Sequence, residues 1–488
     1  MASRRCNCYR SIIFRRVTYV GDLIFCYVRG QGTPASLWTP RDQARDEAAG
    51  RKLQRKCTAC AWGSWMKFVL AAYGTRGDIE SLLAAGRELQ GRGHDVNMAI
   101  PPNLIDLAGK VGLSAVPYGP PPHDFWDDEI LLKFSEFYRN FWTIREPIKL
   151  VREAWEPVLR HWADMNSTLS ELAKGADLLF TGQLYQDLAV NIGEAYDIPL
   201  AVLHYFPMRP NGQLIPYVPA PLARTGFKAY DWMCWRMNKK AEDAQRRKLG
   251  LPKARGASPR RISELGSLEI QAYDEALFPG LAKEWAQWNG KRPFVGALTM
   301  GLTTDRDDEI SSWVASGSPP ICFGFGSMPV KSPADTVNMI AAVCKELGER
   351  ALVCSGWTDF TGVPAYDHVK VVGAANYERT FPACRAIVHH GGSGTTAASL
   401  RAGVPTLILW TAGDQPFFAH QLKKLKVGGG RRFSNTTQET LIADLRRILK
   451  PQYRANARDL AARMTKPSES VGRTADLLEN FARTRCPA

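Results

Sequence analysis

Short apolar runs and amphipathic segments alternate along most of the chain. Residues 68–73 form an apolar run that is typical of a buried strand, and glycines mark a turn at 74–78. Residues 79–91 then carry leucines and alanines at helical spacing, and residues 96–100 form the next apolar run. A strand, a helix and a second strand in this order predict a βαβ unit within a parallel sheet.

The same alternation continues and then starts again after residue 319. Further predicted elements are a helix at 334–347 and strands at 177–181, 200–204, 320–325, 351–354, 369–372, 386–389 and 406–410. The restart predicts an α/β fold with two Rossmann-like, doubly wound parallel-sheet domains that face a cleft. In such folds ligands bind outside the carboxyl ends of the strands.

A polar stretch at 299–319, rich in Gly, Ser and Asp, separates the two sets of predicted strands and is the expected linker. We therefore expect an amino-terminal domain at 66–298 and a carboxyl-terminal domain with a terminal helix at 320–488. The length of 488 residues agrees with two domains. The composition, 45% hydrophobic and 23% charged, is that of a globular protein and excludes disordered and fibrous classes.

Positive charge is concentrated at the amino-terminal end of the chain. The formal net charge of +15, taken alone, suggests nucleic acid or an anionic membrane as a partner. The first 65 residues hold twelve Lys or Arg and four Asp or Glu, a net +8, so the other 423 residues carry only +7. No module with basic residues between aromatics accompanies this charge, and we expect no nucleic-acid partner.

The first 65 residues also lack the signals of a folded or exported domain. Their apolar stretch at 11–28 is interrupted by charged residues, so it is neither a secretory signal nor a membrane span. Cys57 and Cys60 have the spacing of half a zinc knuckle, but no matching pair follows, and we expect no metal site. Met66 directly precedes the first predicted strand. We expect it to be the natural start, with residues 1–65 a basic leader that is disordered or not native.

The densest chemical signal is the segment Val-His-His-Gly-Gly-Ser-Gly-Thr-Thr at 388–396, between a predicted strand and a predicted helix. Glycines there let the backbone approach a ligand, and the amides at a helix start attract an anion. Its hydroxyl groups add hydrogen-bond donors, so the segment suits a diphosphate. The alternative is a tight turn with a capped helix and two histidines satisfied within the protein. The P-loop lysine is missing, which argues against an NTPase.

A second polar signal, Asp414-Gln415-Pro416, follows the predicted strand at 406–410. A carboxylate beside a carboxamide offers acceptors and donors that suit sugar hydroxyls. The alternative is an Asx turn before a helix.

Together these motifs resemble the nucleotide-sugar signature of the GT-B glycosyltransferases. The most similar branch contains the glycopeptide-antibiotic, sterol and mycobacterial glycopeptidolipid glycosyltransferases. Three more segments match that branch in order and spacing: Gly-Thr-Arg-Gly-Asp-Ile-Glu at 74–80, Phe-Gly-Phe-Gly-Ser-Met at 323–328 and Arg-Ala-Gly-Val-Pro at 401–405. The resemblance covers residues 66 to about 430 and leaves the first 65 residues outside it.

The resemblance implies roles for individual residues. Asp78 stands where the family has its general base, and Asp414 and Gln415 stand where it holds the donor sugar. The residues at the diphosphate positions are His389, Gly392, Ser393, Gly394, Thr395 and Ser327. The residues at the nucleoside positions are Trp357, Ala374 and Tyr377. Ser81 departs from the proline of many relatives, and Tyr377-Glu378 is a less typical base contact, which leaves UDP and dTDP both open.

The expected reaction moves a hexose or deoxyhexose from a UDP- or dTDP-sugar to an acceptor hydroxyl. Asp78, at the carboxyl end of a strand, could take the acceptor proton in a direct displacement that inverts the anomeric carbon. Helix amides at 392–395 and the His389 imidazole would stabilise the leaving diphosphate without a metal, so no cofactor is expected. The alternative for Asp78 is a structural carboxylate bonded to Arg76 or to nearby amides.

Aromatic residues are dense at 120–162 and at 205–232, which suits a broad apolar pocket for a hydrophobic acceptor of glycolipid, lipopeptide, sterol or polyketide type. The candidates for this acceptor region are Trp126, Trp142, His204 and Tyr205. Helical spacing makes a core role the alternative for most of these aromatics. We expect a cytoplasmic monomer or weak dimer that can contact the inner face of the membrane peripherally.

Two other functions share this architecture, an inactive auxiliary protein and a sugar-nucleotide epimerase. The first is disfavoured because Asp78, His389 and Asp414 are all present. The second would be expected to carry other carboxylates and to lack the Asp-Gln-Pro pattern. An NAD dehydrogenase is disfavoured because the turn at 74–78 lacks the glycine fingerprint of that class.

Overall fold

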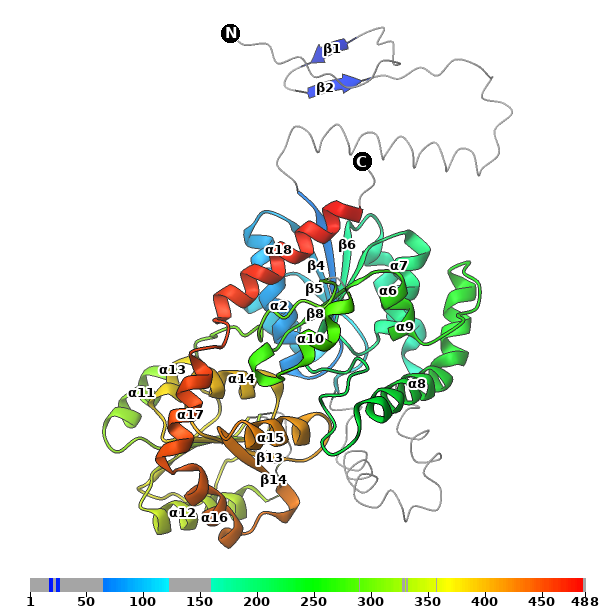
Figure 1. The fold of residues 1–488 in the computed structure, drawn as a ribbon. Coiled ribbons are helices and arrows are strands. Elements are labelled where there is room, and N and C mark those ends of the chain that lie inside the picture. Colours follow the sequence, from blue (N-terminus) through cyan, green and yellow to red (C-terminus); the bar gives the residue numbers. More distant parts are fainter. Residues whose placement is uncertain are drawn as a thin grey trace, which may run out of the picture. The chain divides into compact units, whose positions relative to one another are not determined.

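The computed structural model describes residues 17–20, 23–26, 65–122, 159–288, 290–326, 330, 332–356 and 358–485 (Figure 1). Its internal contacts divide the chain into two units, Met1–Trp65 and Met66–Ala488. In the first unit, β1 (Val17–Val20) and β2 (Leu23–Cys26) pair as an antiparallel hairpin. The hairpin is structure that the sequence analysis did not expect in this segment.

The second unit contains two six-stranded sheets, and in both sheets each strand runs parallel to its neighbours. The first sheet consists of β3 (Lys67–Ala71), β4 (Asp95–Ile100), β5 (Ala115–Pro117), β6 (Leu178–Thr181), β7 (Leu200–His204) and β8 (Leu268–Gln271). The second consists of β9 (Ile321–Gly324), β10 (Ala351–Cys354), β11 (Val369–Val372), β12 (Ala386–His389), β13 (Thr406–Trp410) and β14 (Gly428–Arg432).

Both sheets have the strand order of a Rossmann fold. The first runs β5-β4-β3-β6-β7-β8 and the second runs β11-β10-β9-β12-β13-β14. Counted from the first strand of each sheet, both orders are 3-2-1-4-5-6. The prediction of two doubly wound parallel sheets is confirmed.

Helices cover the sheets and connect their strands. With the first sheet lie α2 (Arg76–Gly91), α3 (Ile105–Lys110), α6 (Trp162–Ala173), α7 (Gln186–Tyr196), α8 (Ala220–Lys248), α9 (Ser258–Glu264) and α10 (Leu281–Trp285). The later helices are α11 (Asp307–Ala315), α12 (Pro333–Leu347), α13 (Tyr377–Thr380), α14 (Ser393–Arg401), α15 (Gln415–Lys424), α16 (Gln438–Ile448), α17 (Pro451–Ala461) and α18 (Pro467–Arg485). Short 3-10 turns are η2 (Pro102–Leu104), η4 (Glu275–Leu277), η5 (Ala286–Trp288), η6 (Phe381–Ala383) and η7 (Phe433–Asn435). The predicted linker stretch contains α11.

Alternate residues of β3 point to opposite faces of the first sheet. Phe68 and Leu70 share a core with residues of α2 and α18, whereas Val69 and Ala71 share a core with residues of α6 and α7. Figure 1 shows these two helix pairs on opposite sides of the strands. Both faces are therefore covered, which explains why this strand is apolar throughout.

The terminal helix α18 returns to the first sheet. Its Leu478 and Phe481 lie in the core that also contains residues of α2. Arg92, directly after α2, forms ion pairs with Asp476 (2.6 Å) and Glu479 (3.1 Å) of α18. The sequence analysis placed this helix with the second sheet, which precedes it in the chain. Periodicity shows that a helix has an apolar face, but not which sheet covers that face.

Strand β14 was absent from the predicted strands because it begins with three glycines. A Cβ atom at Gly428 would lie 1.9 Å from the carbonyl oxygen of Thr406 in the neighbouring strand. One at Gly430 would lie 2.3 Å from the Cβ of Ala419 in α15. Glycine is needed here because a strand and a helix approach the backbone too closely for side chains.

Arg401, the last residue of α14, links the two passages of the chain between the sheets. Its guanidinium donates to the carbonyl oxygens of Ala297 (2.7 Å) and Thr465 (2.9 Å). It also donates to the hydroxyl oxygens of Thr299 (3.1 Å) and Ser470 (3.2 Å). Ala297 and Thr299 lie where the chain leaves the first sheet, and Thr465 and Ser470 lie where it returns. One side chain therefore fastens both passages to α14.

We expect Arg401→Lys to lower the free energy of unfolding by about 2 kcal/mol, because one ammonium cannot replace a fork of donors to four acceptors. Denaturant titration followed by circular dichroism measures the change. Arg379→Lys, at an exposed ion pair with Asp308, is the matched control and should change the free energy by less than about 0.5 kcal/mol. Equal effects of the two substitutions would contradict the role of Arg401.

Candidate functional site

Both sheets reverse their strand order beside their first strand, between β3 and β6 and between β9 and β12. Ligands of doubly wound sheets bind at this switch point, outside the carboxyl ends of the strands. Asp78 follows β3, and His389 is the last residue of β12. Asp414 follows β13, the strand next to β12. Three of the sequence-predicted residues therefore stand at the carboxyl edges of the two sheets.

Asp78 is held in the first turn of α2 by a capping box with Thr75. One carboxylate oxygen accepts from the Thr75 amide (2.7 Å) and from its hydroxyl (3.1 Å). A Cβ at Gly74, whose φ is +143°, would lie 2.3 Å from that oxygen, so only glycine leaves room for the carboxylate. Arg76, the partner weighed in the sequence analysis, pairs instead with Glu80 at 3.3 Å.

Tyr205 contacts the backbone of Asp78. Its hydroxyl donates to the backbone carbonyl oxygen of Asp78 at 3.1 Å, and the Tyr205 ring is buried. A Cβ at Gly182 would lie 2.8 Å from the same hydroxyl, so the tyrosine is closely surrounded. The sequence analysis placed Tyr205 in the acceptor region, and the structure places it where it supports the backbone of Asp78.

Asp78 and Asp414 come from different sheets and are close enough for their charges to interact. Burial raises the pKa of Asp78 to about 6, against the opposing effect of the hydrogen bonds from Thr75. Burial, and then the charge of Asp78, raise the pKa of Asp414 to about 7. The charge of Asp78 therefore disfavours the ionised form of Asp414. Two carboxyl groups that titrate near neutral pH are typical of sites for acid–base chemistry.

His389 presents a buried donor without a partner. Its Nδ1 accepts a hydrogen bond from the Gly391 amide at 2.9 Å, which assigns the ring proton to Nε2. Among the described residues Nε2 has no hydrogen-bond partner, although it is buried. Burial, and then the neighbouring His390, lower the pKa of His389 well below its usual value, so the ring is neutral. An unpaired buried N–H is costly unless a ligand supplies an acceptor.

His390 fills the space between two glycine turns. A Cβ at Gly326, after β9, would lie 2.5 Å from Cε1 of His390, and one at Gly392 would lie 2.7 Å from its Nε2. Burial lowers the pKa of His390 to about 4. This second histidine is therefore neutral and packs between the two turns, but its buried Nδ1 also has no hydrogen-bond partner among the described residues.

The first turn of α14 begins four residues after His389. Gly392 precedes the helix, and Ser393, Gly394 and Thr395 form its partly exposed first turn. A Cβ at Gly394 would meet none of the described residues within 4 Å. Amides at a helix start have no partner within the helix and attract anions. The turn and the His389 donor form one cluster of neutral hydrogen-bond donors.

Gln415 closes the turn after β13. Its carboxamide oxygen accepts from the amides of Thr411 (2.7 Å) and Ala412 (3.4 Å) and from the Thr411 hydroxyl (3.1 Å). A Cβ at Gly391 would lie 3.0 Å from the Cβ of Gln415, so this turn contacts the histidine turn. The sugar contact predicted for Gln415 would therefore use its carboxamide nitrogen.

The predicted nucleoside region contains Ala374, which is exposed, and Tyr377, whose ring stacks on Phe381 with centroids 4.3 Å apart. Burial raises the pKa of the Tyr377 phenol well above its usual value. The neighbouring Glu378 accepts from the Thr299 hydroxyl at 3.0 Å. A Cβ at Gly324, the last residue of β9, would lie 3.3 Å from the Tyr377 hydroxyl, so the stacked pair lies close to the carboxyl end of that strand.

Ser81, which departs from the proline of many relatives, has a defined role. Its hydroxyl donates to the carbonyl oxygen of Leu298 at 3.1 Å. This bond joins α2, the helix of Asp78, to the chain that leaves the first sheet. Proline could not make this hydrogen bond, so the departure adds a contact.

His204 belongs to the interior. It is fully buried on β7, and its Nε2 lies 3.4 Å from a carboxylate oxygen of Glu269. Glu269 on β8 also pairs with Arg209 and Arg292. Burial lowers the pKa of His204 to about 4. The packing alternative describes this residue better than an acceptor contact.

Four further predictions lie outside the described residues, namely Ser327, Trp357, Trp126 and Trp142. The sequence analysis also missed the support of Asp78 by Thr75. The spacing Thr-x-x-Asp at 75–78 is a capping-box pattern and could have indicated it.

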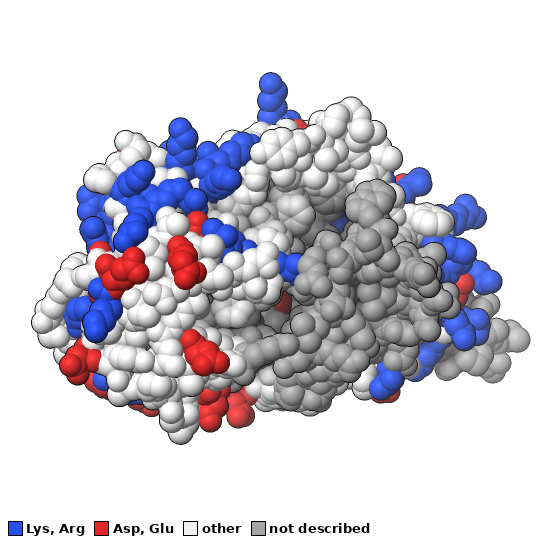
Figure 2. All heavy atoms as spheres, turned by 90° about the horizontal axis from the view of Figure 1, so that it is seen from below, with Lys and Arg blue, Asp and Glu red and all other residues white. Residues whose placement is uncertain are grey.

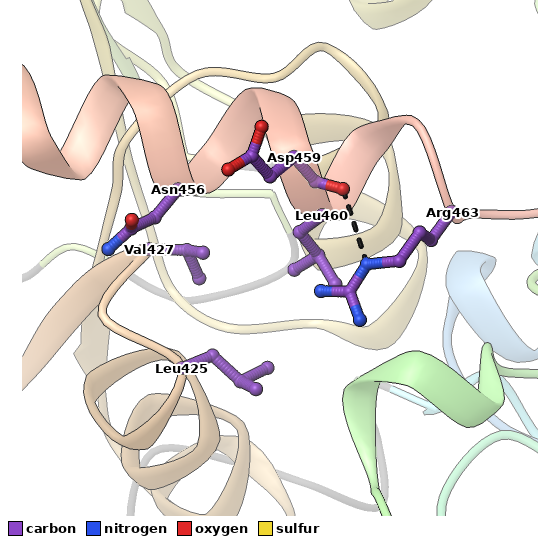
Figure 3. Close-up of a pocket in the computed structure, with 6 residues that line it drawn as sticks. All are labelled: Leu425, Val427, Asn456, Asp459, Leu460 and Arg463. Carbon is purple, nitrogen blue, oxygen red and sulfur yellow. Dashed lines mark hydrogen bonds between the residues drawn. The ribbon is translucent and has the colours of Figure 1, made fainter.

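A pocket elsewhere in the second unit takes no part in this site. Leu425, Val427, Asn456, Asp459, Leu460 and Arg463 line it between α15 and α17 (Figure 3). Within the described ranges no cluster of three His, Cys, Asp or Glu residues suits a metal ion. Of the helices that the structure describes, none has the length and apolar character to cross a membrane.

Residues 356–477 match the family model of the erythromycin biosynthesis protein CIII-like C-terminal domain. An uncharacterised glycosyltransferase of Mycobacterium tuberculosis is 58% identical over 420 residues, which cover 86% of this chain and 99% of that protein. A sterol 3-beta-glucosyltransferase of Arabidopsis thaliana is 27% identical over 422 residues, 81% of this chain and 65% of that protein.

Two crystal structures show a similar fold at low identity. The glycosyltransferase of kitacinnamycin has a TM-score of 0.61 and 16% identity, with 86% of this chain and 100% of that chain covered. The glycosyltransferase VinC, in complex with dTDP, has a TM-score of 0.55 and 18% identity, with 85% and 100% covered.

We expect Asp414→Asn to stabilise the protein at about pH 8 by about 1 kcal/mol and to have little effect below about pH 4. The pKa of Asp414 is higher in the folded chain than in the unfolded chain, so its favourable contribution is complete below pH 3.8 and is lost as the pH rises through about 7. Asparagine does not ionise, so the variant does not lose this contribution to stability as the pH rises. Urea unfolding at both pH values measures the difference. Asp459→Asn, at an exposed carboxyl, is the control, and the same pH dependence in both variants would contradict the assignment.

Proposed function

The chain is a glycosyltransferase of the GT-B fold, and from this premise we propose that it moves a hexose or deoxyhexose from a UDP- or dTDP-sugar to a hydroxyl of a hydrophobic acceptor. The proposed transfer inverts the anomeric carbon and needs no metal. Glycolipids, lipopeptides, sterols and polyketides are the acceptor classes.

One observation carries this proposal: carboxyl groups at the carboxyl edges of the two sheets interact electrostatically beside a cluster of neutral donors. Asp78 has a pKa of about 6 and Asp414 a pKa of about 7. The donor cluster consists of the first turn of α14 and the unpaired Nε2–H of His389. A base facing an anion site is what a transfer from a nucleoside diphosphate requires.

Each residue has a distinct part in the proposed transfer. Asp78, ionised above about pH 6, takes the proton of the acceptor hydroxyl while the oxygen of that hydroxyl attacks the anomeric carbon. The bond from that carbon to the diphosphate breaks, and its electrons remain on the diphosphate. The α14 amides and His389 Nε2–H stabilise the growing negative charge. Asp414 and the carboxamide nitrogen of Gln415 hydrogen-bond sugar hydroxyls and fix the orientation of the ring.

The names of two similar proteins bear on the choice of donor base and acceptor. VinC was crystallised with dTDP, and a relative is named as a sterol glucosyltransferase. Both UDP and dTDP therefore belong in a donor screen, and a hydrophobic alcohol belongs in an acceptor screen. An acceptor of this kind is met at a membrane surface, so peripheral membrane contact is part of the proposal.

We expect Asp78→Asn to reduce transfer about a thousandfold and to leave donor affinity nearly unchanged, because the amide cannot accept the proton. Release of nucleoside diphosphate with a hydrophobic alcohol acceptor measures the rate. For the unchanged chain the rate should rise with pH through about 6, since the base acts when ionised. Asp106→Asn, exposed on α3, is the control. Unchanged turnover in Asp78→Asn would refute the base assignment.

We expect UDP- or dTDP-sugars to raise the melting temperature, and His389→Ala to weaken their binding about tenfold or more through the loss of one hydrogen bond to a charged group. Thermal shift across a panel of both donor types provides the measurement. His161→Ala, before α6, is the matched control. A panel without any shift would count against the proposed donor class.

A further inference from the structure

Helix α8 buries several polar residues and exposes several apolar ones. Its buried residues in the carboxyl-terminal half are polar or charged: Asn238, Glu242, Gln245 and Arg246. Its amino-terminal half buries Ala223 and Phe227, but it also exposes Leu222 (63%), Trp232 (59%) and Met233 (39%) to solvent. A helix that only packs on a sheet shows the opposite pattern, with an apolar inner face and a polar outer face.

The inner polar face is satisfied by the first sheet's other helices. Gln245 accepts from Asn191 on α7 (2.8 Å) and donates to Asn166 on α6 (2.8 Å). Arg246 pairs with Glu194 on α7 at 2.8 Å. This buried network fixes the rotation of α8 about its axis and thereby keeps the apolar side chains turned outward.

The exposed apolar residues form one continuous surface. Leu222 and Met233 are eleven residues apart, about three helical turns, so they lie on the same side of α8, with Trp232 beside them. Tyr217, in the turn before α8, has a positive φ of 62° and is 99% exposed. We call Tyr217, Leu222, Trp232 and Met233 the α8 apolar surface.

The α8 apolar surface continues into positive charge. Arg236, Lys240 and Arg247 are exposed and follow Met233 at spacings of three, seven and fourteen residues, which keeps them on the same side of the helix. The Arg236 guanidinium lies 6.0 Å from the Trp232 ring centroid. Over its whole length α8 carries eight Lys or Arg and three acidic residues. On the right of Figure 2 the coloured charged side chains are mainly basic, beside atoms that are not described, and basic side chains also gather at its upper left.

The surface lies near the residues of the proposed transfer. The Tyr217 ring meets the edge of His420 on α15, with centroids 6.3 Å apart. Helix α15 begins directly after Asp414. A molecule held against the α8 apolar surface would therefore be close to the carboxyl edge of the second sheet.

We propose that the α8 apolar surface and the basic residues after it dock the protein on an anionic lipid membrane. Aromatic and aliphatic side chains insert at the level of the lipid headgroups, and Lys and Arg side chains contact anionic headgroups. Charge complementarity favours this partner, because a cationic surface repels a second copy of itself. The inference rests on the proposed function only in that a membrane-borne acceptor gives the docking a purpose.

Sedimentation of the full chain with vesicles of phosphatidylcholine and phosphatidylglycerol tests the proposal. We expect binding to these vesicles and weaker binding to phosphatidylcholine alone. The double variant Trp232→Gln with Met233→Gln should bind about tenfold more weakly, because two inserted side chains are lost. Arg236→Gln with Lys240→Gln should bind about tenfold more weakly and with a smaller dependence on salt.

Matched controls separate this surface from other basic or apolar residues. Leu265→Gln removes an apolar side chain that is 44% exposed after α9, and Lys345→Gln with Lys450→Gln removes two exposed charges elsewhere. Both controls should bind like the unchanged chain. Unchanged binding by the α8 variants would overturn the proposal and assign any binding to other residues, such as the basic first 65. A dimer that these variants abolish, seen by light scattering without vesicle binding, would also overturn it.

The donor thermal shift, measured on the same samples, separates this proposal from the proposed function. All α8 variants should keep the shift, because none of these residues contacts the α14 turn or His389. Lost vesicle binding with an intact donor shift supports membrane docking. If no sample shows a donor shift, the proposed function is contradicted. Membrane docking is then judged from vesicle binding alone.

Discussion

The hydrogen bonds of the half-buried Arg401 guanidinium are the interaction on which the relation between the two sheets depends. Arg401 ends the helix whose first turn carries the donor cluster, and it holds both passages of the chain between the sheets. The Ser81 hydroxyl bonds Leu298, between two of the residues that Arg401 holds, and so connects α2 with the same point. Because helices are stiff, these few hydrogen bonds position Asp78, at one end of the path, relative to Gly392 at the other end.

Glycines serve the same purpose at the edges of both sheets. Gly74 makes room for the Asp78 carboxylate, and Gly326 and Gly392 make room for the His390 ring. In each case a polar side chain occupies the volume that a Cβ would take, so it lies against the backbone and is shielded from water. Shielding shifts the pKa values of these groups, and close packing limits their movement. The missing Cβ atoms of these glycines therefore determine both the backbone geometry and the pKa shifts at this site.

Most of the fold could be predicted from the sequence, because a strand that is buried on both faces of a parallel sheet is an uninterrupted apolar run that can be recognised without its neighbours. Strand β8 could not, because its buried Glu269 is paired with Arg209 and Arg292 from other parts of the chain. The predicted residues Asp78, His389 and Asp414 stand at the expected strand ends. The electrostatic interaction of Asp78 with Asp414 depends on contacts between segments that are distant in the sequence. The same is true of the unpaired Nε2 of His389 and of the exposed apolar residues of α8. The spacing of residues along the chain does not show such contacts.

The return of α18 to the first sheet has a consequence for the order in which the chain matures. Leu478 and Phe481 complete a core that begins with Phe68, about 400 residues earlier. During synthesis from the amino terminus, the part of that face that α18 covers stays open to water until residues 467–485 have left the ribosome. The second sheet closes from contiguous elements and can form before that moment. Completion of the half that carries Asp78 is therefore a late event, and a chain released too early would expose an apolar sheet face to chaperones and proteases.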